Sequence, residues 1–366
     1  MKGIEKGPTV RIPTQEDLQR DPLLLFLRQK PAFDPDQDAA LFDRLVQDYT
    51  AVADVYLAQR QDARLDGPAS LSNEFNSLAF DTLRWASNEE FLVESVIKLF
   101  DHFKLLQQFR IDKERLKAFI FAIKEHYHLV SYHNFLHAVD ATQFIGYLLI
   151  QGGLGALLEP FDILCLLLTA LGHDLGHPGA STSFDGHLRV FTGQTVDGDT
   201  LEECHLKLLL QLVQNKRIGI ASNWSLRQLS IFKQMAAAQI AATDMNNHLV
   251  ALYYFDHSFQ HIPSDKHGEL AYRRFLTQLA IKCADISNVV RPLQISQKWT
   301  RALSSELHAT DACEVDITSK AIGNSQVAFI DYIAKPLFAA LYLTLPETGD
   351  CLWNLQRNRD QWTLGS

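Results

Sequence analysis

Hydrophobic residues recur along this chain at the spacing of amphipathic α-helices. The clearest buried face has apolar residues at i, i+3, i+4, i+7 and i+11, which are Leu116, Phe119, Ile120, Ile123 and Tyr127. Ser87 and Glu90, just before another such run, have capping-box spacing. The one segment with strand-like composition, Tyr253-Tyr254-Phe255, is short. The pattern therefore predicts an all-α protein, a compact domain built of many helices.

Glycine and proline mark the expected ends of helices and domains. A first helix is expected from Asp38 to Arg64, with Gly67-Pro68 ending it. A later, very apolar helix should run as far as Gly152-Gly153. We place a soft boundary near residue 70. Residues 1–70 are then a polar arm and a helix that pack on the rest or carry regulation, and residues 71–366 form the main domain.

Composition and charge narrow the class of protein. Of the 366 residues, 47% are hydrophobic and 21% are charged, as in ordinary globular proteins. The net charge of −9 argues against a nucleic-acid-binding surface, which needs a basic patch. No apolar stretch approaches the ~20 residues of a membrane span, and the N-terminus lacks the apolar core of a signal peptide. Five scattered cysteines without CxxC spacing predict free thiols and a cytoplasmic location.

Candidate chemistry concentrates in residues 132–179. Two pairs of histidines lie there with four-residue spacing, His133 with His137 and His173 with His177. Because residues four apart share one face of a helix, each pair is expected to point two imidazoles at one site. An acid accompanies each pair, Asp140 after the first and Asp174 within the second. Imidazole with carboxylate binds zinc and similar metals, whereas carboxylate with water suits magnesium or manganese, so we predict a divalent metal site.

Polar residues also interrupt apolar helical segments further along the chain. Glu202 opens one apolar helix, Asp244 follows another, and Asp285 lies between a run of leucine, alanine, isoleucine and cysteine and Ile286. A single acid of this kind is usually solvated or caps a helix. Asp285 is the exception, because burying an unpaired carboxylate is costly and it therefore needs a partner or a metal. Taken alone, Gln326 is either an exposed amide or a ligand contact, and Phe329 is a core residue.

Six motifs, in this order and at these separations, are similar to the catalytic domain of class I cyclic-nucleotide phosphodiesterases. They are YHNFLHAVD from Tyr132, HDLGHPG from His173, TDM from Thr243, CADISN from Cys283, PLQISQKW from Pro292 and SQVAFIDYI from Ser325. The resemblance covers roughly residues 75–366. It implies a compact all-helical domain with a deep pocket for two metals. It also implies hydrolysis of the 3′ bond of a cyclic nucleotide to the 5′-monophosphate.

The resemblance implies a role for individual residues. A tightly bound metal, usually Zn²⁺, would be held by His137, His173, Asp174 and Asp285. Asp174 would also reach a second metal, Mg²⁺ or Mn²⁺, whose waters would be steadied by His177, Glu202 and Thr243. His133 would protonate the leaving 3′ oxygen, and Glu306 would orient His133. The substrate would be bound by Tyr132, Asn288, Leu303, Gln326 and Phe329.

Some details of the resemblance bear on selectivity. Asn288 lies where cAMP-preferring members contact the purine edge, so cAMP is expected over cGMP, with cGMP left open as a second substrate. Gly176 stands where many animal members have Asp, a form more like the fungal high-affinity cAMP enzymes. Thr182 replaces a usual Asn, and Glu203-Cys204 replace a usual Asn-His.

Two other classes of protein stay open: another His-Asp metal phosphohydrolase acting on nucleotides, and a non-catalytic nucleotide-binding scaffold.

Overall fold

The computed structural model describes residues 35–60, 74–179, 200–248, 251–255, 266–308 and 311–364. Within these ranges the chain is helical and has no strand, which confirms the all-α prediction. The α-helices are α3 (Pro35–Arg60), α4 (Glu89–His102), α5 (Leu105–Gln108), α6 (Lys113–Glu125), α7 (Phe135–Ile150), α8 (Pro160–Gly172), α10 (Leu201–Val213), α11 (Leu226–Thr243), α13 (Lys266–Asp285), α14 (Leu293–His308), α15 (Lys320–Phe329), α16 (Lys335–Thr344) and α17 (Gly349–Leu364). Short 3-10 turns connect several of them.

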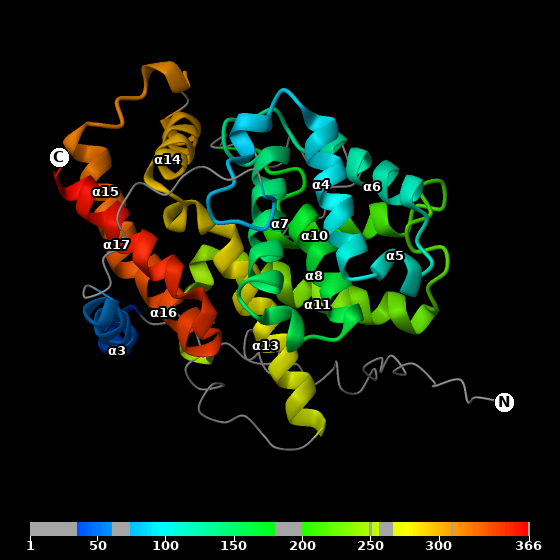
Figure 1. Cartoon of the computed structure of the whole chain (residues 1–366), viewed down its shortest axis with the longest axis horizontal. Coiled ribbons are helices and arrows are strands. Elements are labelled where there is room, and N and C mark those ends of the chain that lie inside the picture. The colour runs from blue at the N-terminus through cyan, green and yellow to red at the C-terminus, as the bar shows by residue number, and fades with distance from the viewer. Residues whose placement is uncertain are drawn as a thin grey trace.

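Helix α13 lies between two groups of helices (Figure 1). The helices from α4 to α11 form one group, and α14 to α17 together with α3 form the other. α13 packs against α11, α7 and α8 in the first group and against α16 in the second. Because Asp285 is the last residue of α13, its carboxylate is carried to the place where the two groups meet.

Helices α7 and α8 are buried along nearly their whole length. Both consist mainly of apolar residues, as expected of a helix enclosed by other helices. Their ends follow the sequence signals. α7 stops at Ile150, shortly before Gly153, whose φ of +78° favours glycine. Pro160 begins α8, where its missing N–H has no helical partner to lose.

Two expected helix starts differ from the structure. The predicted cap at Ser87 is wrong, because Asn88 caps α4 and its side chain accepts the N–H of Phe91 at 3.2 Å. The first helix begins at Pro35 instead of Asp38, since proline is well suited to a first helical turn. The expected end of that helix beyond residue 60 and the domain boundary near residue 70 lie outside the described residues.

The segment with strand-like composition, Tyr253-Tyr254-Phe255, is helical, in agreement with the all-α prediction. The rings of Tyr254 and Phe255 are buried, and that of Phe255 packs edge-on against Phe275 of α13 with centroids 5.4 Å apart. Packing against a neighbouring helix thus overrides the preference of aromatic residues for strands.

Helix α3 packs mainly on α16 and adds Leu45, Tyr49 and Ala53 to the same hydrophobic core as the rest of the chain. The ring of Tyr56 lies 4.6 Å from that of Tyr342, and Nζ of Lys335 lies 2.7 Å from a carboxylate oxygen of Asp54. A regulatory role for residues 1–70 stays a prediction.

Asp140, expected beside the first histidine pair, takes part in a separate buried network. Its Oδ2 lies 3.1 Å from Nη2 of Arg291, and its Oδ1 accepts the hydroxyl of Thr82 at 2.6 Å. Arg291 is fully buried and also donates to the side chain of Gln143. The network joins α7 to the turn that follows α13, so Asp140 is a structural residue and not a metal ligand.

The stretch Lys320–Thr344 is long and apolar enough to cross a membrane by length and composition, and half of its most apolar window is buried inside the molecule. A buried core helix passes the same test. The expected lack of a membrane span therefore stays a prediction.

We expect Arg291→Met to lower the free energy of unfolding by about 3–5 kcal/mol, because it leaves the Asp140 carboxylate buried without its partner. Urea denaturation followed by circular dichroism measures this loss. Lys113→Met is the matched control, since Lys113 pairs with Glu94 at an exposed site and should cost less than about 1 kcal/mol. Equal losses in the two variants would contradict the structural role of Arg291.

Candidate functional site

Four side chains of metal-ligand type meet where the ends of three helices converge. His137 lies in the first turn of α7, which begins directly after its capping residue, Asn134. His173 follows the last residue of α8 with Asp174 beside it, and Asp285 ends α13. The ligand atoms of these four residues all lie within 4.8 Å of one another. The structure therefore brings together the four residues that the sequence assigns to the tighter metal.

Both imidazoles of this group face both carboxylates. Oδ1 of Asp285 lies 3.2 Å from Nε2 of His137 and 3.2 Å from Nε2 of His173. Oδ2 of Asp174 lies 3.4 Å and 3.3 Å from the same two nitrogens. Nδ1 of His173 donates to the carbonyl of Ala170 at 2.9 Å, which fixes the ring and turns Nε2 toward the site.

The electrostatics and donor set of this group fit a divalent metal ion. Burial lowers the pKa of His137, but Asp174 and Asp285 outweigh burial and raise it to about 10. Burial raises the pKa of both carboxyls, yet the imidazoles outweigh it and hold both below their usual range. Oδ2 of Asp174 is buried and accepts no hydrogen bond from the described residues. Two imidazole nitrogens and two carboxylates around one point are a ligand set for zinc or a similar metal.

A second group consists of His133, His177 and Glu306. Oε1 of Glu306 lies 2.5 Å from Nδ1 of His133, and its Oε2 accepts the backbone N–H of Tyr132 at 2.7 Å and of His133 at 3.0 Å. The rings of His133 and His177 stack with centroids 3.8 Å apart. Burial raises the pKa of Glu306, but the hydrogen bond with His133 outweighs burial and lowers it. Glu306 is therefore ionised at neutral pH and holds Nδ1 of His133 as a donor.

The histidines that lie together in the structure are not the ones that are four residues apart in the sequence. Neither four-residue pair shares a helical face, because His133 precedes the cap of α7 and His177 lies in the segment after α8. Each pair sends one member to each group, so that His137 meets His173 and His133 meets His177. The expected helical geometry of the pairs was wrong, although their convergence on one region was right.

Two departures from the family pattern have structural reasons. Gly176 has a φ of +73°, which favours glycine, and a Cβ there would meet Cδ1 of Leu208 at 2.8 Å. Glu203 forms a capping box with Thr200, in which each backbone N–H is accepted by the other side chain. Cys204 is buried in the same helix. Thr182 lies outside the described residues.

Glu202 and Thr243 lie on α10 and α11, two helices that pack together. Burial raises the pKa of Glu202, and the charges of Asp244 and Asp174 raise it further. Thr243 is buried at the end of α11. Burial lowers the pKa of His177 to about 4, so its imidazole is neutral at physiological pH. The charge of Asp174 acts on both Glu202 and His177, and the expected role of these three residues in steadying metal-bound water stays a prediction.

His205 belongs to this region and was missed by sequence reasoning. It is buried on α10, and its Nε2 lies 3.7 Å from Oδ1 of Asp174. Its Nδ1 donates to the carbonyl of Leu175 at 2.6 Å, which supports the turn that carries Asp174. The available signal was its position three residues after Glu202, on the same face of the helix.

Among the predicted substrate residues, Tyr132 lies directly beside the metal-ligand group, and Leu303 packs near Tyr132. Leu303 packs with Tyr132 and Trp299 in a small hydrophobic cluster. The ring of Tyr132 lies 4.8 Å from that of His137. Asn288 is buried in the 3-10 turn Ser287–Val290, three residues after Asp285.

Gln326 and Phe329 occupy successive turns of one face of α15. Phe329 is half-buried, so it is a less complete core residue than expected. Oγ1 of Thr300 lies 3.3 Å from Oε1 of Gln326 and constrains that amide. A π-helical turn, Ile330–Ala334, follows directly, with the N–H of Lys335 donating to the carbonyl of Ile330. Pro336 explains the turn, because it has no N–H to give the carbonyl four residues earlier.

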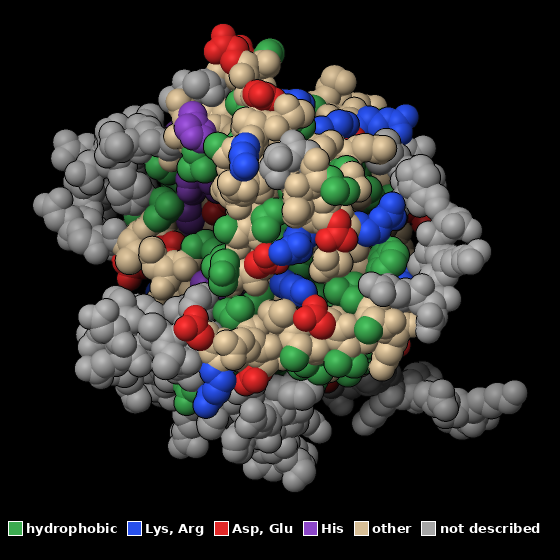
Figure 2. Space-filling view, turned by 90° about the vertical axis from the view of Figure 1, so that its left-hand side faces the viewer, with side chains coloured by type: hydrophobic (Ala, Val, Ile, Leu, Met, Phe, Trp, Pro, Cys, Tyr) green, Lys and Arg blue, Asp and Glu red, His purple; other side chains and the backbone are tan. Residues whose placement is uncertain are grey.

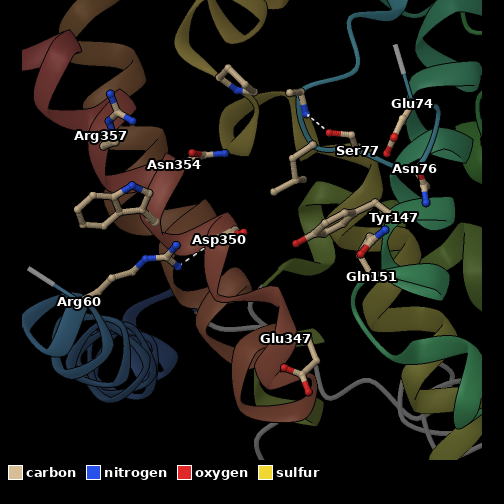
Figure 3. Close-up of a pocket in the computed structure, with 14 residues that line it drawn as sticks. Arg60, Glu74, Asn76, Ser77, Tyr147, Gln151, Glu347, Asp350, Asn354 and Arg357 are labelled. Carbon is tan, nitrogen blue, oxygen red and sulfur yellow. Dashed lines mark hydrogen bonds and ion pairs between the residues drawn. The ribbon is translucent and has the colours of Figure 1, made fainter. Parts of the chain in front are cut away.

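Histidine side chains gather on one part of the surface in Figure 2, with hydrophobic and acidic side chains beside them. A cavity of about 480 Å³ lies elsewhere, where α17 meets α7 and the segment 74–79 (Figure 3). Arg60 and Asp350 point toward each other at its edge. None of the site residues predicted from the sequence lines this cavity, so it is separate from the histidine groups.

Comparison with known proteins gives consistent similarities. Residues 132–355 match the sequence family described as 3′5′-cyclic nucleotide phosphodiesterase. The chain is 29% identical over 295 residues to the 3′,5′-cyclic-nucleotide phosphodiesterase regA of Dictyostelium discoideum, covering 77% of this chain and 37% of that protein. It is 28% identical over 292 residues to the 3′,5′-cyclic-AMP phosphodiesterase 4C of Mus musculus, covering 74% of this chain and 42% of that one. The chain thus spans less than half of these curated relatives.

The fold is also similar to that of solved structures. The phosphodiesterase domain of the RhoPDE fusion protein from the choanoflagellate Salpingoeca rosetta matches with a TM-score of 0.70 and 20% sequence identity. The match covers 80% of this chain and 96% of that one. At this level of identity the likeness concerns the fold alone.

We expect Zn²⁺ binding to the metal-free protein to strengthen as pH rises. His137 keeps its proton at neutral pH, because its pKa is raised to about 10, and that proton must leave when the nitrogen binds a metal. The affinity should rise about tenfold per pH unit between roughly pH 7 and 9 for each proton released. Titration calorimetry in two buffers of different ionisation enthalpy measures the protons. Asp285→Ala, the control, should lose the metal; a wild-type affinity independent of pH would contradict this prediction.

Proposed function

The chain belongs to the 3′5′-cyclic nucleotide phosphodiesterase family, and we propose that it hydrolyses a 3′,5′-cyclic nucleotide to the 5′-monophosphate. One observation carries the proposal. A group of two histidines and two aspartates with the ligand atoms within 4.8 Å lies beside a histidine that is hydrogen-bonded to a buried glutamate. A cation site next to a proton donor is the combination that cleavage of an anionic phosphodiester requires.

The proposed cofactors are two divalent metal ions. Residues that would hold the tighter ion, proposed as Zn²⁺, are His137, His173, Asp174 and Asp285. Asp174 would also reach the second ion, proposed as Mg²⁺ or Mn²⁺, with Glu202, Thr243 and His177 hydrogen-bonding its waters. When bound, such ions offset the charge of the phosphate and lower the pKa of water. The protein itself supplies fixed ligands at helix ends, which suits a site that must keep its geometry.

His133 is the proposed general acid. Hydrolysis breaks the bond between phosphorus and the 3′ oxygen; water supplies a hydroxyl to phosphorus, and the 3′ oxygen takes a proton. With Nδ1 of His133 donating to Glu306, Nε2 is the nitrogen left to give that proton. The carboxylate of Glu306 stabilises the protonated imidazole and fixes its orientation, also through two backbone N–H groups.

The base of the nucleotide is proposed to bind between Phe329 and Leu303, with the amide of Gln326 on its edge. An apolar clamp buries the two faces of a purine, and an amide can satisfy the polar edge. Tyr132 is proposed to complete the wall between the base and the metal ligands. The hydroxyl of Thr300 bonds Oε1 of Gln326 and thereby influences which end of the amide faces the purine.

The proposed substrate is cAMP in preference to cGMP, with Asn288 and Gln326 both on the purine edge. Adenine presents an acceptor at N7 and a donor at N6, whereas guanine presents acceptors at N7 and O6. An asparagine amide has both a donor and an acceptor, so it can pair with adenine at both positions. The alternative is that the amide of Gln326 rotates freely, so that the site binds adenine and guanine alike.

No observation favours the alternative classes. The four metal-ligand residues and the His133–Glu306 pair are all in place, whereas a non-catalytic scaffold would be expected to lack one of them. We also propose a cytoplasmic location, which the five free cysteines support.

We expect His133→Asn to lower kcat by about 10²–10⁴-fold, because a positioned proton transfer is lost, while bound metal is unchanged. Steady-state kinetics with metal analysis on the same sample measures both. Glu306→Gln should lower kcat less, since it only orients His133. A His133→Asn variant that loses metal but keeps its turnover per occupied site would show that His133 is a ligand.

Selectivity is tested by the ratio of kcat/KM for cAMP and cGMP. We expect wild type to favour cAMP, and Asn288→Ala to reduce the ratio by an amount corresponding to about 1–3 kcal/mol, the worth of one pair of hydrogen bonds. Leu303→Ala serves as the control, because it weakens the clamp on both bases alike. Equal efficiencies in wild type, or a ratio that Asn288→Ala leaves unmoved, would remove Asn288 as the selector.

A further inference from the structure

Lys282 is a fully buried lysine next to the metal-ligand group. It lies on α13, three residues before Asp285, with a relative exposure of 1%. Its Nζ donates to the carbonyl of Ala242 at 2.8 Å and lies 3.4 Å from the carbonyl of Asp244. These two carbonyls stand on either side of Thr243, at the end of α11.

A buried ammonium without a carboxylate partner needs a structural reason, because burying a charge is costly. Among the described residues Lys282 has no ion pair, and both of its hydrogen bonds go to backbone carbonyls. The last carbonyls of a helix lack partners within the helix and carry a partial negative charge. Lys282 therefore caps α11 from a neighbouring helix, and this fixes the end of α11 to the metal-bearing end of α13.

The capped end of α11 faces the acids beside Asp174. Asp244 and Asp174 both act electrostatically on Glu202, and Asp244 and Asp285 both act on Lys282. The hydroxyl of Thr243 donates to the carbonyl of Ile240 at 2.8 Å, so its oxygen lone pairs stay available to accept from water. Because Lys282 bonds the carbonyls on both sides of Thr243, it fixes the backbone that sets the position of this hydroxyl.

We infer that Lys282 is a positioning residue for the second, water-ligated cation: by bonding the carbonyls on either side of Thr243, it holds α11 where Thr243 can order that cation's waters. This inference rests on the proposed function. The charge of Lys282 and its hydrogen bonds act in opposite directions. A positive charge near Asp285 repels a cation, so loss of the charge alone would tighten cation binding. Loss of the positioning would weaken it.

The test is Mn²⁺ binding to the zinc-loaded protein, measured by electron paramagnetic resonance without substrate. Lys282→Met should raise the Kd for Mn²⁺ about tenfold or more, the usual loss when a partner of a metal site is removed, with zinc content unchanged. Lys282→Arg, which keeps donors and charge, should recover most of the affinity. Lys335→Met is the matched control, because Lys335 is also largely buried but bonds Asp54 of α3; its Kd for Mn²⁺ should match wild type.

Tighter Mn²⁺ binding in Lys282→Met would overturn the inference, because it would indicate a purely electrostatic effect of Lys282. Unchanged binding would also overturn it, because it would indicate that Lys282 only stabilises the fold. If Lys282→Met does not fold, Lys282→Gln takes its place, with a smaller rise in Kd expected and an unchanged Kd overturning the inference. Hydrolysis of cAMP and cGMP by the wild type is assayed in parallel. Absence of hydrolysis would overturn the proposed function, whereas the Mn²⁺ comparison would still decide the role of Lys282.

Discussion

Two carboxylates and two imidazoles share one small buried volume, and the rest of the site depends on keeping them there. Alone, each buried carboxylate would be expensive, and its pKa would rise until it became neutral. Here the imidazoles of His137 and His173 reverse that shift, so Asp174 and Asp285 remain charged. The four residues come from three helix ends, so their mutual contacts also hold the ends of α7, α8 and α13 together. The contacts that keep the metal-ligand residues charged are therefore also the contacts that hold these three helices together.

A layer of hydrogen bonds outside the site supports the segment that follows Asp285. The side-chain amide of Asn358 on α17 donates to the carbonyls of Val289 and Arg291, each at 2.8 Å. That of Asn354 donates to the carbonyl of Val290 at 3.0 Å. These carbonyls lie at the end of the short 3-10 turn Ser287–Val290 and at Arg291, where no continuing helix supplies donors for them. Helix α17 thus fixes the turn that carries the proposed purine contact, although it lies far from it in the sequence.

The sequence was sufficient to predict burial and candidate ligands where a residue type occurs in only a few kinds of environment. The four metal-ligand types could be named without the structure, since each lies in a distinctive motif, and the apolar character of α7 and α8 predicts their burial. The pairing of the histidines could not be predicted in this way, because the four-residue spacing was interpreted as helical, whereas α7 begins only after His133 and α8 ends before His173. Asp140 is an acid near a histidine pair, as a ligand would be, yet a partner 151 positions away, Arg291, decides its role. His205 and Lys282 were missed because their meaning depends on contacts between helices.

The π-helical turn after Phe329 amounts to one extra residue accommodated within an otherwise continuous helix. An α-helix turns by about 100° per residue, so the inserted residue sets the angular offset between the face that carries Gln326 and the face of α16 that packs in the core. A chain of the same family one residue shorter here would present a different set of side chains to the nucleotide while keeping the same core. Length variation at this turn is thus a route by which the base pocket could diverge without any substitution in the pocket itself.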